Sequence, residues 1–287
     1  MSKISPTSLF HFTEKKEVLK SILQNGLRFS YSKEEFPGCL RPINPEVEFD
    51  GIARHMEKMY VAIPMICFCD IPLSRVSEHV GKYGKYGVAF DKTKMAKDYN
   101  FKGFYELNPI SYYYNDSLVS PLHGLCASIS SLNPSDEDRN NLLRLLGFSK
   151  SYDNHHEHAF FKKQYHCFYD EREWRLVRSN ANGCSNSWLF SYEVDDFDDA
   201  LERKNDELHS TDSAYLGVWR RDKQALGECL YNFITHIIVE RECEIPEFAE
   251  YIMDSRNRIM GVDTLIQSDR ALLCSRLTSL ERINNDF

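Results

Sequence analysis

The stretch MICFCDI, residues 65–71, decides the fold of this chain. It is an apolar run of strand length that ends at Pro72, which indicates a buried β-strand. Alternate residues of a strand share one face, so Cys67 and Cys69 are expected to lie side by side. The nine cysteines are an odd number and include no C-x-x-C pair. We therefore expect free thiols that act as small buried hydrophobic groups in a reducing compartment.

Strands and helices are predicted on both sides of this run in mixed order. The first is a short aromatic strand from Ser8 to Thr13, followed by a helix at 14–24 that Asn25-Gly26 would end. The other expected strands are 88–90, 109–114, 167–177, 188–194 and 235–240. One helix is expected after Pro72, and others at roughly 120–165, 246–253 and 271–283. Residues 30–54 are expected to be loop. Because no βαβ rhythm and no repeat is present, the pattern predicts the α+β class with a mixed, mostly antiparallel sheet.

The composition predicts a folded cytoplasmic protein. The chain has 287 residues, of which 42% are hydrophobic and 27% charged, and a chain of this length buries about 75% of its unfolded surface. We expect one main domain over residues 1–244 and a helical C-terminal appendage over 245–287. No run approaches the roughly 20 apolar residues that span a bilayer, and residues 1–12 lack the features of a signal peptide. We therefore expect no membrane association.

The formal net charge of −8 limits the partners that the whole surface would attract. An acidic balance keeps a protein soluble and disfavours non-specific binding to nucleic acid. A local basic groove is still compatible with this charge, so nucleic acid is disfavoured as a partner and not excluded.

The established sequence motifs of catalysis are absent from the chain. It contains no G-x-G-x-x-G, phosphate-binding loop, G-x-S-x-G or H-E-x-x-H motif. Gly81, Gly84 and Gly87 precede a strand, so a helix end and a turn explain them better than a phosphate cradle does. The run HHEH at 155–158, with His166 nearby, contains good zinc ligands. Neighbouring residues on a helix point in different directions, which favours a polar helix surface, and we expect no metal site.

The segment FYDEREWRLV, residues 168–177, is the most informative about chemistry. If it is a strand, alternation places Tyr169, Glu171, Glu173, Arg175 and Val177 on one face, so two carboxylates point the same way beside an arginine. One interpretation is a solvated strand face with a Glu–Arg ion pair of small energetic value, and composition alone favours it. The other is a carboxylate pair over a sugar. One carboxylate would then stabilise an oxocarbenium-like transition state while the other helps to deprotonate the acceptor.

Several of these segments resemble the AbiGi family of abortive-infection proteins. The resemblance is carried by LFHFT at 9–13, the helix at 19–26, MICFCDIPLS at 65–74, HVGKYGKYGVAFDK at 79–92 and EREWR at 171–175. It covers approximately residues 1–240, and CFCDIPL and Y-G-x-Y-G-x-x-F are its most specific parts. The resemblance implies phage resistance and the antitoxin half of a two-gene system. The partner that it implies is a cognate toxin or another defence-system protein.

A second resemblance is to the ADP-ribosyltransferase fold, and to DarT-like enzymes in particular. It is carried by His-x-Thr on the first strand, a helix that ends in Asn-Gly and a late strand that bears a glutamate. This resemblance implies NAD as the substrate. It also implies that Glu173 is catalytic and that Glu171 assists it.

The residues that would bind NAD are implied by the same resemblance. His11 and Thr13 would contact NAD near its nicotinamide, and Tyr83 or Tyr86 would stack on that ring. The NAD-binding arginine has three candidates, which are Arg41, Arg54 and Arg75. From the residues alone, His11 is explained equally well as a satisfied core histidine between Phe10 and Phe12.

Two classes of function follow. The leading hypothesis is a phage-defence protein with an ADP-ribosyltransferase-like fold that transfers ADP-ribose from NAD to a macromolecule. The alternative is a non-catalytic antitoxin that binds and neutralises a partner toxin. An enzyme requires that His11 and Glu173 converge on one cleft, whereas an antitoxin does not. A nucleic-acid-binding regulator is a third class, and the net charge of −8 weakens it.

Overall fold

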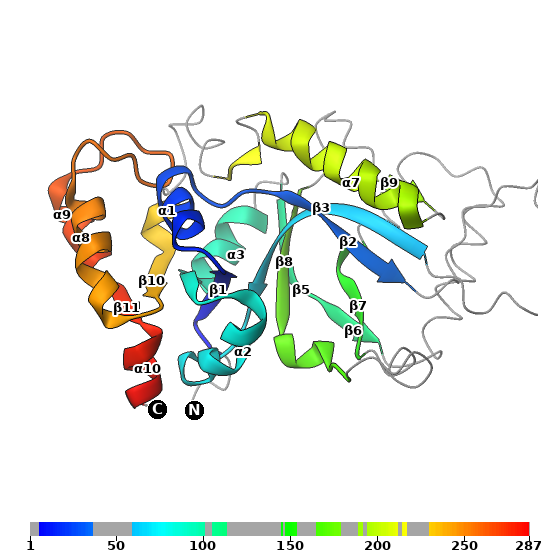
Figure 1. Ribbon diagram of the computed structural model, residues 1–287, viewed down its shortest axis with the longest axis horizontal. Helices are drawn as coiled ribbons and strands as arrows, with labels where there is room; N and C mark the ends of the chain where they lie inside the picture. Colours follow the sequence, from blue (N-terminus) through cyan, green and yellow to red (C-terminus); the bar gives the residue numbers. More distant parts are fainter. Residues whose placement is uncertain are drawn as a thin grey trace, which may run out of the picture.

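The computed structural model describes residues 6–36, 59–100, 105–113, 145, 147–153, 165–178, 189–191, 194–211, 214–216 and 230–286. The strands are β1 (Ser8–Thr13), β2 (Ser30–Phe36), β3 (Met59–Cys69), β4 (Tyr86–Asp91), β5 (Tyr105–Pro109), β6 (Ser111–Tyr113), β7 (Ser149–Ser151), β8 (Glu173–Arg178), β9 (Leu189–Ser191), β10 (Ile234–Val239) and β11 (Leu277–Ser279) (Figure 1). The helices are α1 (Lys16–Asn25), α2 (Val76–Tyr83), α3 (Lys92–Asn100), α7 (Val194–His209), α8 (Ile245–Met253), α9 (Gln267–Cys274) and α10 (Leu280–Asp286). Short 3₁₀ helices include η1 (Leu73–Arg75) and η2 (Phe168–Glu171).

One nine-stranded sheet organises the described part of the chain. Its order is β11-β10-β4-β1-β3-β8-β5, and β2 and β9 also pair with β3. The pairs within it are antiparallel except β10 with β11, which is parallel. This confirms the predicted α+β class with a mixed, mostly antiparallel sheet. The strands with His11, Phe68 and Glu173 (β1, β3 and β8) are successive neighbours in this sheet.

The two faces of the sheet carry different hydrophobic cores. Side chains alternate along a strand, so Leu9 projects to one face and Phe10 to the other. On the first, which we call the large-core face, α1, α3, α7, α8 and α9 contribute apolar side chains. On the second, the small-core face, α2 packs against β1, and α10 packs against α2 and β11. The core residues of these two helices are Val76, Leu280 and Ile283.

A small second sheet covers another part of the small-core face. β6 and β7 form a parallel pair outside the nine-stranded sheet and lie near β8 in Figure 1. Gly147, just before β7, is so close to the main sheet that a Cβ added there would lie 3.7 Å from Ile63 and 3.9 Å from Val177. Ile63, Met65 and Cys69 project to the same face of β3 because alternate residues of a strand share a face. Val177 is the cross-strand partner of Met65, so it projects to that face as well. The small sheet therefore encloses the side chains that β3 and β8 present there.

The glycine-rich segment 81–87 contains the end of α2 and the turn that leads into β4, as the sequence predicts. Gly84 caps α2, and its amide donates to the carbonyl of Val80 at 3.1 Å. Its φ of 105° lies in the region that favours glycine. A Cβ added at Gly84 would lie only 2.2 Å from the carbonyl carbon of Thr13. The turn thus packs directly on the end of β1.

Four predictions of secondary structure are wrong in the described part of the chain. Residues 30–36 form β2 and not a loop, because Tyr31 is buried in the large core and the segment pairs with β3. The predicted strand at 167–177 begins only at Glu173, after the turn η2. The predicted helix at 271–283 is interrupted by β11, because residues 277–279 pair with β10. Within the helix predicted at 120–165, residues 149–151 form β7 because they pair with β6. Most of the other residues of 120–165, and the other parts of 30–54, lie outside the described residues.

A buried arginine holds the helices of the C-terminal segment together. The Arg270 side chain is 0% exposed. Its guanidinium donates to the carbonyl oxygens of Ile252, Asp254, Leu265 and Asn257 at 2.7–3.1 Å. The carbonyls at the end of α8 receive here the partners that a helix C-terminus lacks. Arg270 thereby fixes α9 against the end of α8.

Candidate functional site

A group of charged side chains lies between the nine-stranded sheet and the small sheet, and we call it the ionic cluster. Its members are Glu34 from β2, Lys150 from β7, Glu171 from η2, and Glu173 and Arg175 from β8. All five are connected by ion pairs, directly or through one another. Four separate elements therefore bring together the candidate site that the sequence suggested at Glu171 and Glu173.

Lys150 holds both candidate catalytic glutamates. Its Nζ donates to Glu171 Oε2 at 3.0 Å and to Glu173 Oε2 at 2.9 Å. The two carboxylates converge as predicted, but strand alternation is not the reason. Arg172, between them, is left-handed with φ 44° and ψ 50°. This turn, and not a continuous strand, directs Glu171 toward the lysine.

Arg175 is the centre of the cluster and is 0% exposed. Its Nε donates to Glu173 Oε1 at 2.7 Å, and its guanidinium lies 2.9 Å from Glu34 Oε2. Nη1 donates to the carbonyl oxygen of Gly147 at 2.8 Å. A buried charge of this kind requires paired charges and hydrogen bonds around it, and the arginine has both.

The outer edge of the cluster reaches α2 through His166. The His166 Nε2 lies 2.7 Å from Glu171 Oε1, and the Nδ1 lies 3.0 Å from the Lys82 Nζ. An ammonium only donates, so Nδ1 accepts and the ring proton sits on Nε2, which donates to Glu171. Tyr83 also hydrogen-bonds to Glu171. These contacts connect the C-terminal turn of α2 to the cluster.

The charges determine the protonation states of the cluster. Burial alone would raise the pKa of Glu173, but the attraction of Arg175 and Lys150 outweighs it and lowers that pKa to about 2. Burial would likewise raise the pKa of Glu171, and Lys150 and the hydrogen bonds lower it. For Glu34 burial dominates, and its pKa is raised. Burial opposes the charge of Lys150, yet the nearby glutamates raise its pKa.

The interpretation of Glu173 and Arg175 as a solvated ion pair is wrong. The exposed fractions are 6% for Glu171, 7% for Glu173 and 0% for Arg175. The small sheet covers this part of β8, and sequence alternation gives no information about such a covering layer. The pair is a buried one, so the loss of one partner has a far larger effect than at a surface.

The other predicted site residues lie in two separate places. Tyr83 lies beside Glu171 in the cluster, as its hydrogen bond shows. His11, Thr13 and Tyr86 lie away from the cluster, on the opposite face of the sheet. Phe10 is paired with Cys69, and Cys69 with Glu173, so Phe10 and Glu173 share the small-core face. His11 follows Phe10, and alternation directs it to the opposite face.

His11 contacts the large-core face of the sheet. Its ring lies edge-on to Phe68, with centroids 6.1 Å apart. Its Nδ1 lies 2.9 Å from the carbonyl oxygen of Cys67. Burial lowers the pKa of His11 more than this hydrogen bond raises it, so the ring is neutral and Nδ1 donates to the carbonyl. His11 thus has the contacts of a satisfied core histidine.

Thr13 and Tyr86 are cross-strand partners on the same face as His11. The Tyr86 hydroxyl donates to Glu244 Oε1 at 3.0 Å, at the start of α8. Among the arginines proposed for NAD, Arg75 is exposed in η1, whereas Arg41 and Arg54 lie outside the described residues.

Sequence reasoning missed Glu34 and Lys150 of the ionic cluster, and His166 at its outer edge. Glu34 fell in a predicted loop. Lys150 is 21 residues from Glu171 in the sequence, and no spacing rule connects two such positions. His166 was noticed only as a neighbour of a histidine run that lies outside the described residues.

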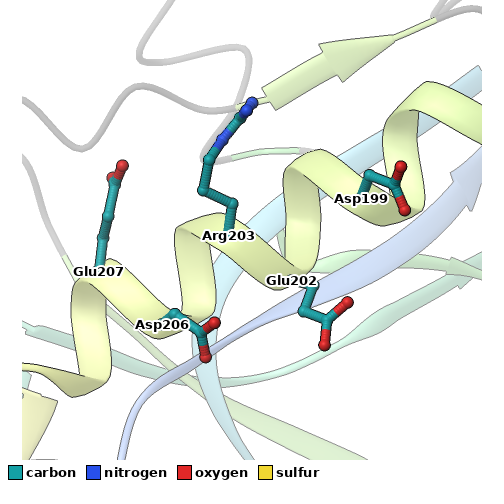
Figure 2. Close-up of a pocket in the computed structure, with 5 residues that line it drawn as sticks. All are labelled: Asp199, Glu202, Arg203, Asp206 and Glu207. Carbon is teal, nitrogen blue, oxygen red and sulfur yellow. The ribbon is translucent and has the colours of Figure 1, made fainter.

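A second charged feature is a hollow on the outer surface of α7. Figure 2 shows its lining side chains, all from this one helix: Asp199, Glu202, Arg203, Asp206 and Glu207. Arg203 and Glu207 extend to one side of the helix, and Glu202 and Asp206 to the other. All five are exposed. A row of charges on one helix is an ordinary solvated face.

Two further features are absent from the described part of the chain. No three His, Cys, Asp or Glu side chains come together there as metal ligands, and the HHEH run at 155–158 lies outside it. Within the same residues, no helix has both the length and the apolar character needed to cross a membrane.

The fold and the cluster define an α+β protein whose central charges are paired with one another beneath a small second sheet. A family model with the description abortive phage resistance protein AbiGi, antitoxin, matches residues 50–215. The chain belongs to the AbiGi family, which confirms that resemblance and assigns the chain to phage defence. No curated protein and no solved structure matches it. The ADP-ribosyltransferase-like fold therefore stays a prediction.

Proposed function

We propose that this chain is a non-catalytic antitoxin that binds and neutralises a toxin protein in abortive infection. The family description supports the antitoxin role. The observation that carries the non-catalytic part is the pairing within the ionic cluster. Both Glu171 and Glu173 are buried and share the ammonium of Lys150. Their charges are already compensated by protein groups.

The placement of the predicted NAD-binding residues also favours this proposal over an ADP-ribosyltransferase. An enzyme of that kind requires the histidine and the catalytic glutamate to face one substrate. Here strand registry directs His11 and Glu173 to opposite faces of the sheet. A glutamate that stabilises a developing positive charge on ribose also acts best when no fixed cation already neutralises it. Arg175 and Lys150 both contact Glu173.

The experiment uses this chain and the product of the neighbouring toxin gene, purified separately. We expect calorimetry to show a complex of the two proteins, and co-expression to relieve the growth arrest that the toxin causes. Nicotinamide release from NAD is measured in the same preparations, with and without lysate of phage-infected cells. We expect no release above that of buffer. Nicotinamide release by the folded wild-type chain, or relief of toxicity without a complex, would contradict the proposal.

A further inference from the structure

Four tyrosines gather on the outer side of the ionic cluster, and we call them the tyrosine patch: Tyr112, Tyr152, Tyr165 and Tyr169. Tyr169, in η2, stacks on Tyr152 with ring centroids 5.3 Å apart and 18° between the planes. The Tyr112 ring meets Tyr169 edge-on, also at 5.3 Å. The Tyr165 hydroxyl donates to the Asp153 carboxylate at 3.1 Å. The backbone of Asp153 forms an isolated antiparallel β-bridge with that of Cys167.

Two rings of the patch are exposed although they are large and apolar, and those of Tyr112 and Tyr152 are half-buried. Tyr165 is 48% exposed and Tyr169 is 46% exposed. Tyrosine supplies a large contact area at a low cost in conformational entropy, and it is enriched in the energetic centres of protein interfaces. An exposed ring that packs on half-buried rings, as Tyr169 does on Tyr112 and Tyr152, therefore has the properties of a binding surface.

Backbone and cluster contacts hold the patch in one arrangement. The amide of Glu173 donates to the Tyr112 hydroxyl oxygen at 2.9 Å. The amide of Tyr169 donates to the carbonyl of Tyr152 at 3.1 Å, and the amide of Tyr152 to the carbonyl of Tyr113 at 2.8 Å. The ionic cluster thus fixes the small sheet, and the small sheet fixes the tyrosines. A rigid surface loses little entropy when it binds.

The charges around the patch indicate its partner. Asp170 is exposed and follows Tyr169 directly. The pKa of the Tyr152 hydroxyl is raised, first by its hydrogen bond to Cys167 and also by the charge of Asp170. Asp153 adds a second carboxylate, whereas Arg172 is the exposed basic residue of the same turn. Ring faces beside carboxylates match a guanidinium, which stacks on aromatic rings and pairs with carboxylates.

We propose that the tyrosine patch docks an arginine-bearing surface of the partner toxin. This inference rests on the proposed function, because it assigns the place and the chemistry of toxin binding. The same rings could stack on nucleic-acid bases, but the two carboxylates would then face phosphates and repel them. The acidic surface of α7 offers charge without aromatic rings, so it serves as the control surface.

The test compares patch variants with control variants in calorimetric binding to the purified neighbouring-gene toxin. Tyr169→Ala removes a ring, and we expect about thirtyfold weaker binding. Asp170→Lys reverses an exposed charge without touching the core, and we expect at least about tenfold weaker binding. Leu272→Ala on α9, where the side chain is 51% exposed, and Asp199→Lys on α7 should bind within about twofold of the wild type. Melting temperatures verify that each variant is folded.

Each alternative outcome is distinct. If the wild type binds the toxin and both patch variants bind equally well, the patch assignment is wrong and the antitoxin function stands. If Asp199→Lys weakens binding and Asp170→Lys does not, the partner docks on α7 and the assignment is equally wrong. If the wild type does not bind the toxin, the proposed function fails and this inference with it. If a single-stranded oligonucleotide binds and only the patch variants lose it, the occupant is nucleic acid and the inference is overturned.

Discussion

At the scale of single residues, Glu173 is the position where charge and stability are most closely connected. Its carboxylate accepts hydrogen bonds from Arg175 at 2.7 Å and from Lys150 at 2.9 Å while only 7% exposed. Removal of one partner of a buried pair leaves the other charge without compensation. The side chain thus contributes to folding whatever the protein binds.

We expect Glu173→Gln to lower the free energy of unfolding by about 3 kcal/mol, because it keeps the volume and removes the charge that two buried cations share. Urea unfolding measures this. Glu202→Gln on α7 is the matched control, since the Glu202 side chain is exposed, and it should change stability by no more than about 0.5 kcal/mol. Equal effects of the two substitutions would show that the ionic cluster is not a stabilising unit.

The pKa of Glu173, about 2 against an ordinary 4.5, gives a pH dependence with a definite sign. A carboxyl whose pKa is lowered by folding stabilises the protein above the unfolded pKa and loses that contribution as the pH falls toward the folded pKa. Stability should therefore decrease between about pH 5 and pH 2. In a ¹³C-carboxyl NMR titration, the resonance of Glu173 is the glutamate signal that the Glu173→Gln variant lacks. Its chemical shift should still be that of an ionised carboxylate at about pH 3. Titration of that resonance near 4.5 would contradict the assignment.

At the scale of secondary-structure elements, two glycines of the α2 region allow a matched comparison. Gly81 lies inside α2, where an added Cβ meets nothing within 4 Å. Gly84 ends the helix with φ 105°, and an added Cβ would lie 2.2 Å from Thr13. We expect Gly81→Ala to stabilise by about 0.5–1 kcal/mol through helix propensity. Gly84→Ala should destabilise by about 2 kcal/mol or more. Thermal unfolding of both variants measures these changes in stability. An unchanged melting temperature of Gly84→Ala would mean that the turn does not pack on β1.

Arg270 determines how the last helices pack. Its guanidinium satisfies four buried or partly buried carbonyl oxygens. Arg270→Met keeps much of the side-chain volume and leaves those acceptors without a donor, so we expect a loss of about 3 kcal/mol or more. Arg256→Met is the control, because the Arg256 side chain is 87% exposed. Hydrogen exchange at the end of α8 should increase only in the Arg270 variant, and unchanged protection would contradict this role.

At the scale of the whole molecule, the segment after Glu244 contributes to both cores. Phe248, Ile252 and Leu273 belong to the large core, and Leu280 and Ile283 to the small one. β11 pairs with β10 at the edge of the nine-stranded sheet. The division into residues 1–244 and a C-terminal appendage stays a prediction, and truncation tests it.

A chain that stops after Glu244 should not unfold cooperatively, because β10 and β4 would lose the layers that bury them. Circular dichroism during thermal unfolding measures this. The control stops after Asn284 and removes residues 285–287, of which Asn285 and Asp286 are exposed, and it should melt as the full chain does. A cooperative transition of the 1–244 chain near that of the full chain would show that the appendage is an independent unit.

The sequence by itself determined the strands with strong local patterns. Residues 8–13, 65–69 and 173–177 were identified because apolar and aromatic residues dominate them, and the α+β class followed from the order of the elements. The same reasoning failed at residues 30–36, whose sequence SYSKEEF is polar. That strand forms because β3 offers it a complete set of pairing partners. Local propensity is overridden there by long-range hydrogen bonding.

The candidate site divides in the same way. The sequence identified Glu171, Glu173 and Arg175 and their shared orientation, together with the family and its antitoxin description. Only the tertiary structure decided that they are buried, that Lys150 joins them and that His11 faces away. Burial and ion pairing depend on the layer that the small sheet places over β8, and His11 is separated by the registry of β1 with β3. Periodicity describes one segment at a time, whereas a covering layer and a strand register are relations between distant segments.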